Sequence, residues 1–280
     1  FDLIERFTLV SNWELGLYLG LGVTTGIVAL AYVWMVYQVE ERFDRWSMPF
    51  WAKALMGGLA VGVIGAFGSS HIFGVGHEGV ELALAGALGV AMMATLVILK
   101  MLATSITLGA GGSGGVFAPA LFIGAMTGGV FGSVMGGLFP TVTASPGAYA
   151  LVGAAAVFGA AAHAPMTAIV ILFEMTDDYR IILPLMLAVV LAQIIASRLN
   201  PDSIYSIKLR RLGGFRLSEG EMGTLDILLV ADDMEEEVRS VHESMDLDQL
   251  AELAQQPGIK DLSALWQDAD RHQSLVFEHE

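Results

Sequence analysis

Long apolar stretches separated by short polar segments dominate the first 200 residues of the chain. The first stretch runs from about Asn12 to Phe43 and ends in the charged cluster EERFDRW. Its interior, from Leu15 to Val39, contains no Asp, Glu, Lys or Arg, and ~20 apolar residues suffice to cross a hydrocarbon core. The pattern predicts a full-length, tilted transmembrane helix, the only conventional span that we expect.

The later apolar pieces are shorter and are interrupted by glycine and proline. A helix over residues 165–176 would be about 18 Å long, well short of the ~30 Å hydrocarbon core. Such a helix must end inside the membrane, where non-helical backbone is tolerated only if protein buries it or it lines a cavity. The pattern predicts an all-α polytopic membrane protein with broken helices, typical of a channel or transporter. The pieces cover roughly residues 49–68, 77–86, 88–109, 117–138, 146–161, 165–176 and 182–199.

Basic residues gather at two places, after the long helix and near the last apolar piece. Positively charged segments tend to stay in the cytoplasm. We therefore expect a multi-pass integral membrane protein whose C-terminus is cytoplasmic and whose long helix enters from outside. The basic residues are Arg42, Arg45, Lys53, Arg198, Lys208, Arg210 and Arg211.

After Arg211 the pattern becomes that of a soluble domain. The strand-like run LDILLVADDM is followed by an acidic loop and by MDLDQLAELAQQ, a helical pattern that Pro257 and Gly258 stop. A second strand-like run, SLVFE, lies near the last residue. We expect a transmembrane domain over residues 1–213 and a short cytoplasmic α+β extension over 214–280.

Composition and charge agree with this division. The chain is 55% apolar with 33 glycines, and residues 212–280 carry 17 acidic against 4 basic side chains. The net negative charge disfavours nucleic-acid binding, and the lack of cysteine excludes disulfides and thiolate sites. The opening FDLIERFTLV lacks the basic start of a signal peptide, so we expect the chain to begin inside a longer protein.

A glycine cluster that opens into an apolar helix is the most informative motif, GAGGSGGVFAPALFIGAMTGG over residues 109–129. Phe117 should begin the helix, with Pro119 in the first turn, where its missing N–H costs no helical bond. The free amides of Val116 and Phe117 would face the glycine-lined space. Because a helix N-terminus carries about half a positive charge, we expect an anion there, held by partial charges.

The glycine cluster has two interpretations. Gly114 and Gly115, together with Ser113, would let the backbone approach an anion closely and support the binding loop. Glycine clusters in membrane proteins also simply permit close helix packing. The residues alone leave both interpretations open.

Three stretches resemble the CLC family of chloride channels and chloride/proton antiporters. GSGGVFAP resembles the family's G-x-F-x-P signature, with Gly115, Phe117 and Pro119 in the signature positions. GAAAVFGAAAHAPMTAIVILFEMTDDYRIILPLMLA, residues 153–188, and SIYSIKLRRLG, residues 203–213, follow in the family's order and spacing. The resemblance covers the whole predicted transmembrane domain and corresponds to the second of the family's two inverted-topology halves.

The resemblance implies chloride transport, as a channel or in exchange for protons, and no enzymatic activity or cofactor. In the family, backbone amides at the signature helix and a Ser and a Tyr hydroxyl hold the central chloride; by motif, these amides and the Tyr are Val116, Phe117 and Tyr205. Apart from the resemblance, a role for Tyr205 in the site has a physical basis, because Ser203 can cap a helix that begins beside it, which would let the phenol point from that helix start. The alternative is an interfacial tyrosine, common where helices meet lipid headgroups. The family's serine and its gating and proton-pathway glutamates belong to the other half, so channel and antiporter are not separated.

The resemblance further implies a homodimer in the lipid bilayer, with helices 165–176 and 182–199 in its interface. The tail resembles the start of a cystathionine-β-synthase-type (CBS) domain, which many CLC proteins carry. Complete pairs of such domains can bind adenine nucleotides, but only part of one copy is present, so nucleotide binding has no support.

Three ionisable groups have simpler interpretations than catalysis or metal binding. Glu174 is a carboxylate at the membrane edge and therefore a functional candidate, but pairing with Arg180 or capping a helix explains it more simply. His163 is expected to pack near the turn before Pro165, since no second metal ligand lies at usable spacing. GHEGVE, with Glu78, fits a loop and a helix start, so we expect no metal site.

An intramembrane serine hydrolase is the rival from another class. Ser113 would be the nucleophile and His163 the base. Such a pair needs contact within ~3 Å, which the sequence does not indicate.

Overall fold

The structure is a computed structural model, and it describes residues 11, 13–176, 178–206, 240–241, 262–268 and 271–277. The chain divides into two compact units, Phe1–Arg216 and Leu217–Glu280. The described part of the first unit is helical, and that of the second unit is a small β-sheet.

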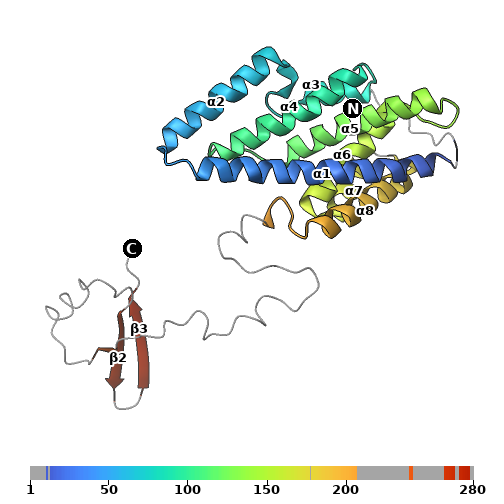
Figure 1. Cartoon of the computed structure of the whole chain (residues 1–280). Coiled ribbons are helices and arrows are strands. Elements are labelled where there is room, and N and C mark those ends of the chain that lie inside the picture. The colour runs from blue at the N-terminus through green and yellow to red at the C-terminus, as the bar shows by residue number, and fades with distance from the viewer. Residues whose placement is uncertain are drawn as a thin grey trace. The chain divides into compact units, whose positions relative to one another are not determined.

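The first unit is a bundle of α-helices with two short 3₁₀ helices (Figure 1). α5, α7 and α8 begin and end where the apolar pattern predicts, and the other helices differ from it by a few residues at most. The polytopic helical fold predicted from the sequence is thereby confirmed. The helices are α1 (Glu14–Asp44), α2 (Phe50–Phe67), η1 (Ser70–Ile72), α3 (His77–Leu84), α4 (Val90–Gly109), α5 (Phe117–Leu138), α6 (Pro146–Ala162), α7 (Pro165–Thr176), η2 (Tyr179–Ile181) and α8 (Ile182–Leu199).

The expectation of a single conventional span is wrong. Four helical segments are long and apolar enough to cross a membrane, namely α1, α4, α5 and the continuous stretch Tyr179–Leu199. The glycines of α5 do not interrupt that helix, which is continuous over 22 residues, and four of them, Gly124, Gly128, Gly129 and Gly132, lie against neighbouring helices. α2, α6 and α7 are shorter apolar helices, as the pattern predicts.

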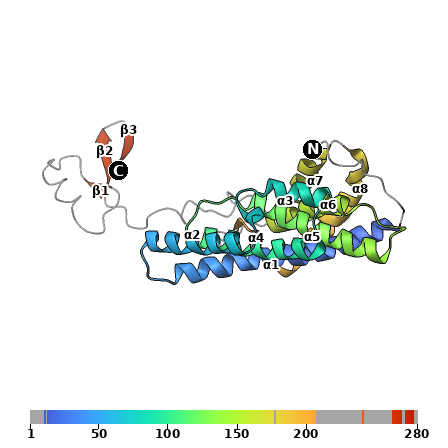
Figure 2. The same ribbon diagram turned by 90° about the horizontal axis from the view of Figure 1, so that it is seen from above.

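α6 forms the centre of the bundle. Its residues from Gly147 to Ala161 are all buried, and α1, α5, α7 and α8 pack around it. α1 runs the length of the bundle (Figures 1 and 2) and also packs against α4 and α8. In Figure 1, α2, α3 and α4 lie above α1, and α7 and α8 lie below it.

α5 and α6 approach so closely that the glycines at their contact have no room for a side chain. A Cβ on Gly128 would lie 2.0 Å from the Tyr149 carbonyl oxygen, and one on Gly153 would lie 2.5 Å from the Gly124 carbonyl oxygen. The packing interpretation of glycine therefore holds for these residues of α5 and α6.

Two buried charged side chains tie the helices to the loops. The Glu14 carboxylate accepts hydrogen bonds from the hydroxyls of Tyr18 and Tyr149, both at 3.3 Å, and from the Ala144 N–H at 3.1 Å. This links the start of α1 to the start of α6. Lys100 of α4 donates to two carbonyls of the segment before α3, at 2.8 Å each, and its Nζ lies 4.9 Å from the centre of a ring on α5. The carbonyls are those of Ile72 and Gly74, and the ring is that of Phe122.

The described part of the second unit is a three-stranded sheet in the order β1-β2-β3, formed by β1 (Ser240–Val241), β2 (Leu262–Asp268) and β3 (Arg271–Phe277). β1 and β2 are parallel, and β2 and β3 are antiparallel with Leu262 opposite Phe277. The SLVFE pattern falls largely in β3, whereas β2 was not expected. The predicted strand LDILLVADDM and the helix MDLDQLAELAQQ lie outside the described residues.

Candidate anion-binding site

The start of α5 matches the sequence prediction. Phe117 is its first residue, Val116 occupies the N-cap position without a side-chain hydrogen bond, and Pro119 stands in the first turn. The Ala120 N–H donates to the Val116 carbonyl at 3.1 Å and closes this turn. Among the described residues, neither the Val116 nor the Phe117 N–H donates to a protein acceptor, so both are available to a ligand.

The loop before α5 is exposed, and backbone hydrogen bonds hold its shape. Gly111 adopts a left-handed φ of 87°, which favours glycine. The Gly112 N–H donates to the Thr107 carbonyl at 2.9 Å, which folds the loop back on α4. The loop residues Ser113, Gly114 and Gly115 are exposed.

Tyr205 lies on a turn that Ser203 caps. The Ser203 hydroxyl accepts hydrogen bonds from the backbone N–H groups of Tyr205 at 3.3 Å and Ser206 at 3.1 Å. The capping role expected of Ser203 is confirmed. Burial raises the pKa of Tyr205, which lies beyond the last spanning helix, so its phenol stays protonated and able to donate at neutral pH.

The neighbouring residue fixes this turn to two helices. The Ile204 N–H donates to the Ala161 carbonyl at the end of α6 at 2.9 Å, and the Ile204 carbonyl accepts a hydrogen bond from the Tyr37 hydroxyl of α1. About half of the Tyr205 side chain is exposed. The backbone of the turn is therefore rigidly held, while the phenol is left accessible.

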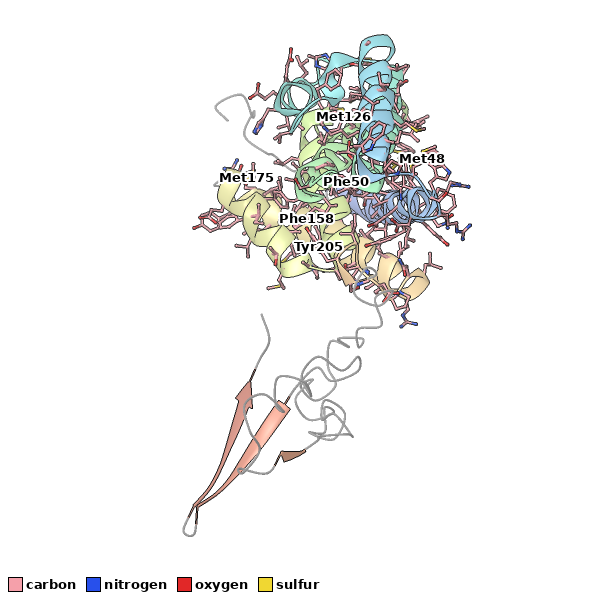
Figure 3. The ribbon with its side chains drawn as sticks, turned by 90° about the vertical axis from the view of Figure 1, so that its left-hand side faces the viewer. Met48, Phe50, Met126, Phe158, Met175 and Tyr205 are labelled. Atoms are coloured by element: carbon pink, nitrogen blue, oxygen red, sulfur yellow. The ribbon has the colours of Figure 1, made fainter. Side chains whose placement is uncertain are left out.

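α6 brings this turn and the start of α5 to the same part of the bundle. Phe158 lies one turn before Ala161, and its ring packs edge-on against that of Phe117, with centres 4.7 Å apart. Figure 3 labels Phe158 and Tyr205 within the helical unit. The two segments predicted to share a site, around residues 116–117 and around 205, thus both pack on the last turns of α6.

Sequence reasoning missed a third element of the site, Tyr32 of α1. Its side chain is fully buried, and its hydroxyl donates to the Val116 carbonyl at 3.5 Å. The only available signal was a hydroxyl-bearing residue within the apolar run ALAYVWMVY.

The site's electrostatics come from partial charges. No Asp, Glu, Lys or Arg occurs between Met101 and Phe173, so α5, its loop and α6 contribute only amides and dipoles. Such donors suit a monovalent anion that must bind and leave, and offer no ligand set for a metal. Among the described residues, no group of three or more His, Asp or Glu side chains could hold a metal ion.

The structure bears on one of the two simpler accounts of Glu174, its pairing with Arg180, whereas capping of a helix by Glu174 stays a prediction. Glu174 and Arg180 are both exposed, and no ion pair joins them in the described part of the chain. The α7–η2 connection is capped instead by Asp178, whose carboxylate accepts from the Arg180 N–H at 3.0 Å. Glu78 lies in the first turn of α3, as expected, and its carboxylate is 3.6 Å from the His71 imidazole.

The two residues of the hydrolase alternative lie in different segments, Ser113 in the loop before α5 and His163 at the end of α6. His163 ends α6 in a left-handed conformation with φ of 56°, before the turn at Pro165, which is a common way to close a helix. Ser113 lies in the exposed glycine loop.

The fold is that of a polytopic helical membrane protein. The chain belongs to the voltage gated chloride channel (CLC) family, whose model matches residues 4–197. This family gives the serine hydrolase alternative no support.

Relatives and solved structures show the same likeness. The chain is 34% identical over 208 residues to the putative chloride channel protein ClcB-like of Ralstonia nicotianae, covering 74% of this chain and 48% of the relative. It is 34% identical over 200 residues to the H(+)/Cl(-) exchange transporter ClcA of Yersinia pestis bv. Antiqua, covering 70% and 42%. A crystal structure of a slow cyanobacterial Cl-/H+ antiporter superposes with a TM-score of 0.67 at 28% identity, covering 75% and 49%. The chain thus spans about half the length of these proteins.

Proposed function

We propose that the chain supplies one wall of a chloride-transport pathway. The anion is held by the Val116 and Phe117 amides and by the Tyr205 hydroxyl. The observation that carries this proposal is the start of α5, where two neighbouring N–H groups have no protein acceptor among the described residues. Unsatisfied amides inside a membrane protein are costly, and an anion at a helix N-terminus offsets that cost.

Two further features support chloride as the ligand. Hydrogen bonds from neutral donors can replace part of an anion's hydration shell without trapping it, as conduction requires. The ClcA relatives are named as H(+)/Cl(-) exchange transporters. We propose transport, by a channel or in exchange for protons, and not catalysis, with no cofactor required.

We also propose that the protein works as a homodimer whose interface includes α7 and α8. Both helices carry large apolar side chains that the described helical unit leaves exposed, repeating every three or four residues along each helix. This spacing makes one continuous apolar face per helix. A second copy would cover these faces better than lipid, because Met, Ile and Val can interdigitate with the same residues of the partner. The residues are Met166, Val170, Leu183, Met186, Val190 and Ile194.

The tail is proposed to be the cytoplasmic beginning of a CBS-type domain, with the division from the transmembrane domain near residue 213. The basic residues before this point support a cytoplasmic location. The β2–β3 hairpin is compatible with an α+β domain. Adenine-nucleotide binding is not proposed for this partial copy.

The proposal is tested by ion flux in liposomes that contain the full-length protein. A potassium gradient with valinomycin drives efflux, while electrodes record chloride and pH together. Chloride efflux above that of empty liposomes is expected. Opposed proton movement would identify an antiporter, and its absence a channel. Liposomes that contain the protein but release no more chloride than empty liposomes would contradict the proposed function.

A further inference from the structure

Tyr32 carries a polar hydroxyl group on a side chain that is fully buried. The side chain is fully buried among apolar neighbours of α1 and the bundle, where phenylalanine would fill nearly the same volume. A buried hydroxyl costs free energy unless it is hydrogen-bonded. Its hydrogen bond to the Val116 carbonyl, 84 residues away in sequence, is therefore the contact that distinguishes tyrosine from phenylalanine at this position.

The acceptor of this bond belongs to the peptide group that is proposed to bind the anion. The Val116 carbonyl and the Phe117 N–H lie in one planar trans peptide unit, so they point in opposite directions. One lone pair of the carbonyl takes the Ala120 N–H at 3.1 Å, and the other is available to the Tyr32 hydroxyl. A donor on the carbonyl side, here at 3.5 Å, thus adds to the Ala120 bond in orienting the plane whose N–H faces out of the helix start.

The same bond also makes the amide a better donor. A hydrogen bond to a carbonyl polarises its peptide group, and hydrogen bonds in a chain strengthen one another. Tyr37, five residues further along α1, holds the carbonyl of Ile204 beside Tyr205. Tyr32 of α1 therefore hydrogen-bonds to the peptide group that carries the Phe117 amide, and Tyr37 hydrogen-bonds to the residue beside Tyr205.

We propose that Tyr32 is a positioning residue of the anion site, acting through the Val116–Phe117 peptide group. This inference rests on the proposed function, because it assigns to Tyr32 the orientation and donor strength of the Phe117 amide. A residue that merely filled space would need no hydroxyl.

The test replaces Tyr32 in the full-length protein and measures anion binding by calorimetry. Tyr32→Phe should weaken chloride binding about two- to fivefold, the effect of one modest hydrogen bond. Thiocyanate binding should weaken less, because a large, diffuse anion gains less from each hydrogen bond. In ¹⁵N-phenylalanine-labelled protein, the Phe117 amide resonance should shift without added anion. A fluorinated tyrosine at position 32, which keeps the shape but donates more strongly, should tighten chloride binding.

Tyr18→Phe is the matched control, because Tyr18 is an equally buried tyrosine of α1 whose hydroxyl bonds to Glu14 at the start of the helix. It should lower the unfolding temperature and leave both anion affinities unchanged. Wild-type protein that fails to bind chloride saturably would contradict the proposed function itself. Wild-type protein that binds chloride, together with equal losses for both anions and an unmoved Phe117 resonance in Tyr32→Phe, would overturn the positioning role. If Tyr32→Phe does not fold, the fluorinated variant decides, and unchanged chloride affinity in it would overturn the inference.

Discussion

Tyr205 is the one side chain that the proposed site uses as a direct donor. Its backbone is held by Ser203 and by the Ile204 contacts, so removing the hydroxyl should not move the turn. Tyr205→Phe should weaken chloride binding by about 0.5 to 1.5 kcal/mol, the usual contribution of one neutral hydrogen bond. Calorimetric titration of the full-length protein measures this change. Tyr179→Phe, at a residue three-quarters exposed on η2, is the control and should have no effect. Unchanged affinity in Tyr205→Phe would exclude this hydroxyl from the site.

Ser113 is expected to be a loop residue and not a nucleophile. It is exposed among glycines, and its neighbours leave the backbone free to approach a ligand. A serine-directed fluorophosphonate probe should label the wild-type protein and Ser113→Ala equally weakly. Specific labelling that is lost in Ser113→Ala would revive the hydrolase.

The sequence predicted the residues at the start of α5 that belong to the candidate site. It did not predict the α1 tyrosines that hydrogen-bond to the site's backbone. Val116, Phe117 and Pro119 could be placed because a helix start is signalled by adjacent residues. The contacts of Tyr32 with Val116 and of Tyr37 with Ile204 join residues 84 and 167 positions apart. No local pattern encodes such a contact, so it appears only once the helices are packed.

At the scale of helices, the α5–α6 contact depends on the absence of side chains. A Cβ at Gly128 would lie 2.0 Å from the Tyr149 carbonyl oxygen, whereas one at Gly136 of the same helix would have nothing within 4 Å. Gly128→Ala should therefore force the helices apart and destabilise the protein by about 1 to 3 kcal/mol or more. Gly136→Ala should be neutral or slightly stabilising. Thermal unfolding in detergent compares the two, and equal unfolding temperatures would contradict the close packing.

The helix bounds were predictable, whereas the number of spans was not. Charged ends, prolines and apolar runs marked α5, α7 and α8 to the residue. Glycines in α5 and α6 suggested breaks, yet α5 is continuous over 22 residues. Glycine weakens an isolated helix, but tight packing against α6 compensates, and only the tertiary structure shows that compensation.

At the scale of the whole molecule, we propose that the chain supplies only part of the transport pathway. It spans about half of each relative, and short helices such as α7 end where the backbone needs partners from other protein segments. We expect the 280-residue chain, reconstituted alone in liposomes, to release no chloride. Supplying the remainder of the full-length protein, in cis or as a separate chain, should restore efflux. Selective chloride efflux from the 280-residue chain alone would show that it is an autonomous transporter.

The central claim is that an anion binds at the start of α5. The most direct measurement is a crystal structure of the full-length protein grown in bromide, with data collected at the bromine absorption edge. We predict an anomalous peak within hydrogen-bonding distance of the Val116 and Phe117 amide nitrogens and of the Tyr205 hydroxyl. A map with bromide bound elsewhere, and no peak at these three donors, would contradict the claim.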